Sequence, residues 1–244
     1  MKIHIYLAMQ ILVFFLIANA TSTFAKPIVV IIGPPGSGKG TQASMLKGSL
    51  NWVLISPSNI LRDAKEKGSV LALEKKAAGE DDVAKDNLKF RIVHELFKEE
   101  KTNSSGVILD SWPKTANAIG LANKAIFTGN QVIMIELTVD LVDPNILISR
   151  ALKRKVCESA DCGRSFGEDN EAKDGCCRFC YSPLITKKRD NETEFPDRLK
   201  LYQNRKSAIL NEYRTLNIPV YKVNCVGDKE EIHKKIMEIV NGSI

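Results

Sequence analysis

The stretch Gly33-Pro34-Pro35-Gly36-Ser37-Gly38-Lys39-Gly40-Thr41-Gln42 directly follows an apolar, β-branched run, Pro27 to Ile32. This order predicts a strand, a glycine-rich turn and a helix. Such a turn lets backbone N–H groups converge on one anion, and the positive N-terminus of the helix adds to them. The Lys39 ammonium would reach the β- and γ-phosphates of a nucleotide. The general phosphate-loop pattern has Ser or Thr right after the lysine, whereas here Gly40 intervenes before Thr41.

The stretch therefore predicts a nucleoside triphosphate site, and a glycine-rich turn without a ligand is the alternative. The residues that we expect around the phosphates are Gly36, Ser37, Gly38, Lys39, Gly40 and Thr41.

Length and composition indicate an ordinary globular chain. Its 244 residues suit one sizeable domain, or one domain with insertions, and 44% of them are apolar and 26% charged. The formal charge is +6, and removing residues 1–25, in which Lys2 is the charged side chain, leaves +6 − 1 = +5. This excess suits anionic phosphates but lacks the dense basic stripe of a nucleic-acid-binding protein. We expect no nucleic-acid partner, and we expect a monomer.

The first 25 residues have the pattern of a secretory signal peptide. Lys2 precedes an apolar stretch from Ile5 to Ala20, and small and polar residues follow up to Ala25. The stretch falls short of the roughly 20 apolar residues that span a bilayer. We expect cleavage near Ala25 and export to the outside, the periplasm or an organelle lumen. The alternatives are a mis-assigned start in a cytoplasmic protein and an N-terminal anchor, the one contact with a membrane that we consider.

Apolar runs and helical patterns alternate along the rest of the chain. The predicted strands are Pro27–Ile32, Trp52–Ile55, Val107–Leu109, Gln131–Leu137 and Pro219–Val223. Asp143-Pro144 predicts the start of one helix, and Asp228 predicts the cap of the last. The alternation predicts an α/β fold with a parallel five-stranded sheet, helices on both faces and the ligand at the carboxyl ends of the strands. The polar, cysteine-rich stretch from Cys157 to Asp190 interrupts the pattern like an inserted subdomain.

From Lys26 onward the chain resembles the adenylate kinase family of P-loop proteins, in its long form with an inserted lid. The resemblance rests on the phosphate loop with Gly after its lysine, on Ile60-Leu61-Arg62 and on the stretch Gly106 to Thr115. It also rests on the pair Arg150 and Arg154 and on the stretch Lys187 to Leu199. It implies a kinase-like domain over residues 26–244, with a segment for the nucleoside monophosphate at 57–85 and a lid at 156–190.

The resemblance also implies roles for individual residues. Lys39, Arg154, Arg198 and Lys187 would carry catalysis by neutralising charge on the moving phosphoryl group. Asp110 would orient Mg²⁺ bound with ATP through the water shell of the ion. Further contacts to ATP would come from Arg150, Arg154, Ser165, Phe166 and the backbone near Lys229. Contacts to AMP would come from Pro57, Arg62, Ser111, Lys114, Lys187 and Arg198.

Departures from the family pattern gather on the acceptor side. Pro57-Ser58-Asn59 replaces Thr-Gly-Asp, and lysines at 114 and 187 replace arginines, which loses the planar fork that grips phosphate. Ala118 replaces the glutamine that reads the acceptor adenine. The sequence thus predicts the donor, ATP, while the acceptor stays open. Transfer of the γ-phosphate of ATP to AMP is the leading expectation, and the alternatives are transfer to another monophosphate and an exported ATP-binding pseudo-enzyme or interaction protein.

Cysteines in the lid predict a metal site. Cys157, Cys162, Cys177 and Cys180 approximate the four-cysteine zinc pattern of some adenylate kinases, although Cys157 lies two residues further out. Tetrahedral zinc–thiolate sites accept spacers of two to four residues. A structural zinc ion is our first expectation, and disulfide pairing in an oxidising compartment is the alternative.

Overall fold

The computed structural model describes residues 25–66, 68–100, 104–139, 145–159, 162, 164–167, 175–187 and 190–243. The predicted leader, up to residue 24, and the predicted helix start at Asp143-Pro144 lie outside them. The described residues form a five-stranded sheet in the order β2-β3-β1-β4-β8, with every neighbouring pair parallel. The parallel α/β prediction is confirmed. The strands are β1 (Pro27–Ile32), β2 (Val53–Ile55), β3 (Val107–Asp110), β4 (Gln131–Thr138) and β8 (Val220–Asn224).

The central strand β1 divides the hydrophobic core into two layers. Successive side chains of a strand point to opposite faces. Ile28, Val30 and Ile32 accordingly pack on one face, and Val29 and Ile31 pack on the other. All five are buried, which explains why β1 reads as a continuous apolar run rather than an alternating one.

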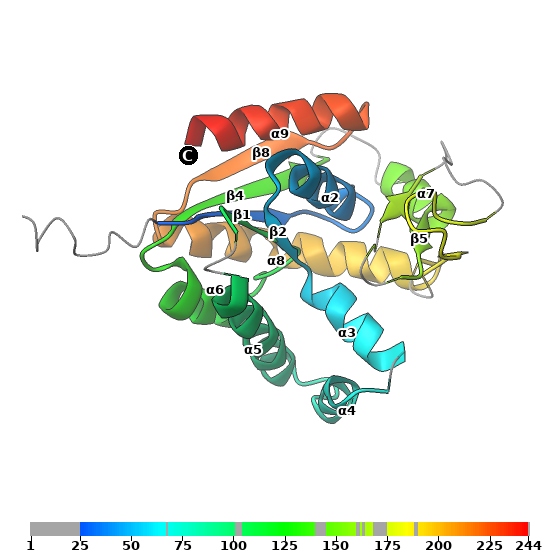
Figure 1. Ribbon diagram of the computed structural model, residues 1–244, viewed down its shortest axis with the longest axis horizontal. Helices are drawn as coiled ribbons and strands as arrows, with labels where there is room; N and C mark the ends of the chain where they lie inside the picture. The colour runs from blue at the N-terminus through cyan, green and yellow to red at the C-terminus, as the bar shows by residue number, and fades with distance from the viewer. Residues whose placement is uncertain are drawn as a thin grey trace, which may run out of the picture.

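Helices cover both faces of the sheet (Figure 1). One face packs against α2 (Lys39–Leu50), α7 (Asn145–Lys153) and α9 (Lys229–Ser243). The other face packs against α5 (Asp82–Glu100), α6 (Ala116–Ala122) with the π-helical turn η1 (Asn123–Phe127), and α8 (Glu194–Thr215). Asp228 caps α9 as the sequence predicted, because its Oδ1 accepts hydrogen bonds from the backbone N–H groups of Glu230 and Glu231.

Two excursions leave this core. The segment with α3 (Pro57–Glu66) and α4 (Val70–Ala77) projects below the sheet, and the lid lies on the α7 side (Figure 1). In its described part the lid is a three-stranded antiparallel sheet, β6-β5-β7, made of β5 (Lys155–Cys157), β6 (Ser165–Phe166) and β7 (Leu184–Ile185). Within the described ranges, none of the helices is long and apolar enough to cross a membrane.

Gly106 allows the loop before β3 to pass directly under Trp52. A Cβ atom at this position would lie 2.4 Å from Cδ2 and Cε2 of the Trp52 indole, which is itself buried. The residue therefore tolerates no side chain without a shift of the indole ring or of the strand that follows.

We predict that Gly106→Ala lowers the free energy of unfolding by about 1–3 kcal/mol, because overpacking forces neighbouring groups to move. Gly48→Ala is the matched control. Gly48 lies in α2 with nothing near its missing Cβ, so alanine there should be neutral or stabilising. Urea titration of both variants checks this, and equal stabilities would contradict the packing argument.

Candidate active site

The glycine-rich loop leaves an open cradle at the start of α2. Gly36 has φ +78°, and a Cβ atom there would lie 2.6 Å from the Leu147 carbonyl oxygen, so only glycine fits between the loop and α7. Gly38 has φ +82° with open space around its missing Cβ, and it occupies the N-cap position of α2. The loop therefore exposes backbone N–H groups and a helix N-terminus to whatever occupies that space.

Lys39 projects into the cradle. Its Nζ donates hydrogen bonds to the Pro34 carbonyl oxygen at 2.6 Å and to Ser37 Oγ at 3.4 Å. Burial is the main cause that lowers the pKa of Lys39 from 10.5 to about 7, with Lys114 and Arg154 acting in the same direction. Asp110 opposes this shift. An anion in the cradle would favour the charged ammonium.

Asp110 ends β3 beside the cradle, as expected where the carboxyl ends of parallel strands meet. Its Oδ2 accepts a hydrogen bond from Ser56 Oγ at 3.0 Å, and its Oδ1 accepts one from Ser111 Oγ at 2.9 Å. These two hydroxyl groups fix the carboxylate plane. The side chain remains partly exposed and lies next to the Gly40 position.

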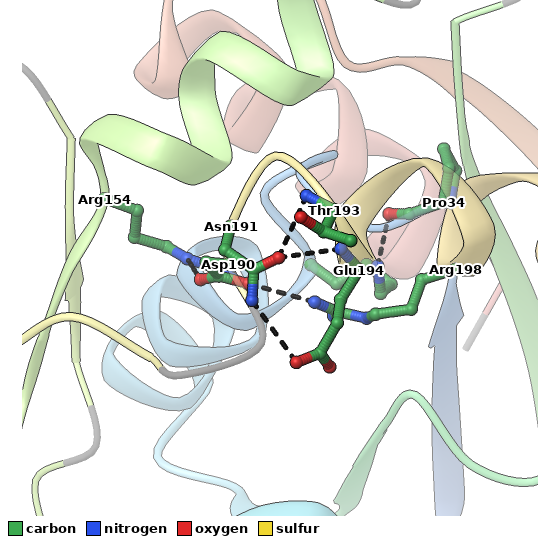
Figure 2. Close-up of polar contacts among 8 residues, drawn as sticks. Pro34, Arg154, Asp190, Asn191, Thr193, Glu194 and Arg198 are labelled. Carbon is green, nitrogen blue, oxygen red and sulfur yellow. Dashed lines mark hydrogen bonds and ion pairs between the residues drawn. The ribbon is translucent and has the colours of Figure 1, made fainter.

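Asp190 joins two of the predicted catalytic arginines (Figure 2). Its buried carboxylate accepts hydrogen bonds from Nε and Nη2 of Arg154 on one oxygen and from Nη1 of Arg198, at 3.1 Å, on the other. Arg154 follows α7 and Arg198 lies in the first turns of α8, so the carboxylate ties the two stems of the lid together. One negative charge faces two positive charges, which leaves a net positive site.

Asn191 fixes the start of α8 beside that carboxylate. Its Oδ1 accepts hydrogen bonds from the backbone N–H groups of Thr193 and Glu194 at 3.0 and 2.7 Å, and its Nδ2 donates to Glu194 Oε1 at 3.3 Å (Figure 2). This arrangement satisfies N–H groups that a helix start leaves unpaired. It therefore fixes the start of the helix that carries Arg198.

Arg62 and Lys187 form the other side of the site. Nε and Nη2 of Arg62 are buried, and among the described residues neither has a hydrogen-bond partner. Burial, together with the charges of Arg154 and Arg62, lowers the pKa of Lys187 from 10.5 to about 8. Lys187 and Arg62 are thus electrostatic neighbours. Of the other residues predicted on this side, Pro57 is buried at the start of α3, while Ser111 is partly exposed and Lys114 exposed.

The residues predicted around the donor base lie in two places. Arg150 Nη1 donates a hydrogen bond to the Cys225 carbonyl oxygen at 2.8 Å, and Gln42 Nε2 donates one to the Lys229 carbonyl oxygen at 2.9 Å. Arg150 and the backbone of Lys229 therefore lie near the phosphate loop. Phe166 instead packs with Cys157 and Cys177 in a small core of the lid and is 7% exposed.

The four predicted lid cysteines converge. Their sulfur atoms all lie within 4.8 Å of one another, with 3.3 Å between Cys157 and Cys180 and 3.6 Å between Cys162 and Cys177. All four are unbonded thiols, and Cys176 next to them lies outside the cluster. Hydrogen bonds from Ser182 are the main cause that lowers the pKa of Cys180 to about 6, whereas burial raises the pKa of Cys157.

Comparison with known proteins identifies the family of this chain. Residues 31–218 match the family model described as adenylate kinase. The chain is 32% identical to adenylate kinase of Geobacter sulfurreducens over 217 residues, which cover 87% of this chain and 97% of that protein. It is 31% identical to adenylate kinase of Zymomonas mobilis over 219 residues, which cover 87% and 95% of the two chains.

The chain belongs to the adenylate kinase family. It is therefore a phosphotransferase of the nucleoside monophosphate kinase class. The resemblance drawn from the phosphate loop and the spaced motifs is confirmed.

In this adenylate kinase family member, sequence analysis missed several polar partners of the predicted site residues. The sequence marks Asp190 only as the end of the lid and predicts no role for Ser56 or Asn191, although all three form hydrogen bonds within the site. Asn191 and Glu194 have the three-residue spacing of a helix capping box, which is a usable signal. Nothing in the sequence marks Asp190 as the partner of both Arg154 and Arg198, since that contact depends on how α7 and α8 pack.

We predict that Lys187→Arg changes the pH dependence of acceptor use. With its pKa lowered to about 8, Lys187 is charged below that pH and neutral above it, whereas arginine stays charged throughout. The ratio of acceptor kcat/KM of Lys187→Arg to that of the wild type should therefore increase as the pH rises through about 8. The exposed Lys200→Arg is the control, with a constant ratio. A constant ratio for Lys187→Arg as well would contradict the assigned charge.

Proposed function

We propose that this chain transfers the γ-phosphate of ATP to AMP, giving two molecules of ADP. The observation that carries the acceptor phosphate is the buried guanidinium of Arg62, of which two nitrogens lack a partner among the described residues, and the relatives named adenylate kinase support AMP as the acceptor. Leaving buried donors unsatisfied costs about 1–3 kcal/mol per group, so such a site favours an anion that accepts their hydrogen bonds. A phosphate monoester supplies that anion.

The donor triphosphate would occupy the open cradle of the phosphate loop. Its oxygens would accept hydrogen bonds from the loop amides and from the Lys39 ammonium, which would exchange the Pro34 carbonyl for phosphate. Arg150, near the carbonyl of Cys225, would lie against the adenine, with the backbone near Lys229 beside it. Ser165 and Phe166 would contribute from the lid only after a rearrangement, because Phe166 is packed inside the lid.

Charge neutralisation would supply the catalysis. Phosphoryl transfer spreads negative charge over the oxygens of the moving group, and positioned arginines are worth roughly 10³–10⁵ in rate. Arg154 and Arg198 already converge on Asp190, whose single charge leaves an excess of positive charge for the moving group. Lys187 and Lys114 would hold the acceptor phosphate beside Arg62, with Ser111 and Pro57 lining the acceptor site.

Asp110 suits a magnesium ion that arrives with ATP. The residue offers a fixed carboxylate with hydroxyl groups on both sides, and hard oxygen donors of this kind suit Mg²⁺ held through water. Bound Mg²⁺ would offset negative charge on the phosphates. The residues of this chain would hold the ion in place through Asp110 while Lys39 stays on the phosphates.

A second candidate is transfer to a different nucleoside monophosphate. Ala118, at the position of the adenine-reading glutamine, is fully buried within the hydrophobic core, and the nearby hydroxyl of Thr115 bonds to Asp86 and caps α6. Neither residue offers the amide that would distinguish adenine. This observation favours acceptor bases that bind by shape rather than through that hydrogen bond.

We predict that AMP is the preferred acceptor in a coupled assay with ATP–Mg²⁺ and AMP, CMP, UMP, GMP or dAMP. Lys39→Ala is the background control and should lose activity about 10²–10³-fold while remaining folded. Preference for another monophosphate would overturn the AMP proposal in favour of the second candidate. Binding of ATP with no turnover on any acceptor would support a pseudo-enzyme.

We further propose that the cysteine cluster binds one structural zinc ion. Zinc–sulfur bonds of about 2.3 Å place tetrahedral sulfur ligands about 3.8 Å apart. The sulfur distances of 3.3 and 3.6 Å within the cluster are close to this spacing. Because all four thiols are mutually adjacent, their arrangement fits a four-cysteine zinc site better than two separate disulfide bonds. The ion would hold β5, β6 and the loop before β7 as one rigid body.

We predict about one zinc ion per chain on metal analysis, lost in Cys180→Ser because one ligand is removed. Cys176→Ser is the matched control and should keep its zinc, since Cys176 lies outside the cluster. Absence of zinc, with two lid disulfides seen by mass spectrometry, would reverse the assignment.

A further inference from the structure

The loop that carries Ser111 and Lys114 is fixed to the core at both ends. At its start, the backbone N–H of Ser111 donates a hydrogen bond to the Ile31 carbonyl oxygen of β1 at 2.9 Å. At its end, the Thr115 hydroxyl donates to the buried carboxylate of Asp86 in α5 and also accepts from the Ala118 N–H at 3.1 Å. Between these points the loop carries two residues of the proposed acceptor site.

A long-range hydrogen bond anchors the middle of this loop. Tyr213 in α8 donates its hydroxyl to the Pro113 carbonyl oxygen at 2.9 Å, across 100 residues of sequence. Tyr213 is 0% exposed and Pro113 is buried too. The contact is therefore shielded from water, and without the hydroxyl the carbonyl would lose its partner in a buried place.

Helix α8 connects this anchor to the lid. It begins beside the lid stem, where Arg198 meets Asp190, and packs further along against α6 (Figure 1). Midway, Tyr202 and Lys206 contact the buried carboxylate of Glu136 in β4, at 3.1 Å in each case. The helix is thus fixed to the central sheet, and this holds the Tyr213 hydroxyl next to the Pro113 carbonyl of the loop.

We infer that Tyr213 is a positioning residue for the acceptor site. Its hydroxyl sets the backbone of Pro113 and thereby the direction in which the next residue, Lys114, reaches the acceptor phosphate. The inference rests on the proposed function of the loop as an acceptor site. It adds a residue with no motif of its own, which is buried in the hydrophobic core and contacts the loop through its hydroxyl.

Steady-state kinetics of Tyr213→Phe test this inference, using whichever monophosphate the wild type phosphorylates best. Removing a buried hydrogen bond displaces the loop without removing any group that touches ATP, so the acceptor KM should rise about tenfold. The KM for ATP should stay within about twofold, since the phosphate loop is fixed independently.

Tyr221→Phe is the matched control, because it removes another tyrosine hydroxyl, which accepts a hydrogen bond from Ser243 at 3.0 Å, on β8 and away from both the loop and α8. It should lower thermal stability to a similar degree and leave the acceptor KM unchanged. If Tyr213→Phe fails to fold, Thr115→Val releases the same loop at its end and should raise the acceptor KM alone. An unchanged acceptor KM in the folded variant, or equal increases for acceptor and ATP, would overturn the inference. Lack of turnover in the wild type would instead contradict the proposed function.

Discussion

The site depends on one constraint, the repulsion among the cations gathered at the carboxyl edge of the sheet. Burial is the main cause that lowers the pKa of Lys39 and Lys187, and neighbouring cations lower both further. Lys114 and Arg154 act on Lys39, and Arg154 and Arg62 act on Lys187. Asp110 and Asp190 offset part of that charge from two different elements, β3 and the lid stem. The remaining excess is stabilised best by a ligand with several negative charges along its length. A donor and an acceptor nucleotide placed end to end provide such a ligand, which is why the fold brings these side chains to one edge of the sheet.

The sheet explains how residues far apart in sequence reach that edge. The phosphate loop follows β1, Asp110 ends β3 and Cys225 follows β8, and parallel strands present all these ends on the same side. Each strand is held by apolar side chains on both faces, and this fixes the position of the polar residues just beyond its end. The lid and α8 then close the arrangement through Asp190, Tyr202 and Tyr213. We therefore regard α8 as the element that links donor and acceptor sides.

Most of the fold could be predicted from the sequence, because hydrophobic period and turn residues are local signals. The five strands lie within a residue or so of their predicted positions, and Asp228 caps α9 as expected. The basic side chains that gather at this edge could also be named from the sequence, Lys39 from the glycine-rich loop and the arginines from the family resemblance. Partners formed by packing were not. Asp190, Tyr213 and the burial of Phe166 inside the lid depend on contacts between elements distant in sequence, for which no spacing rule exists.

In the proposed function, two anion sites face each other across one transfer position. Inhibition by a bisubstrate analogue, two adenosines joined by five phosphates, tests this arrangement most directly. Such a molecule fills both sites only if the donor and acceptor phosphates bind end to end. We expect one analogue to bind per chain and to inhibit competitively against ATP and, in separate titrations, against AMP. Competition with ATP alone, while AMP still binds to the inhibited protein, would contradict it.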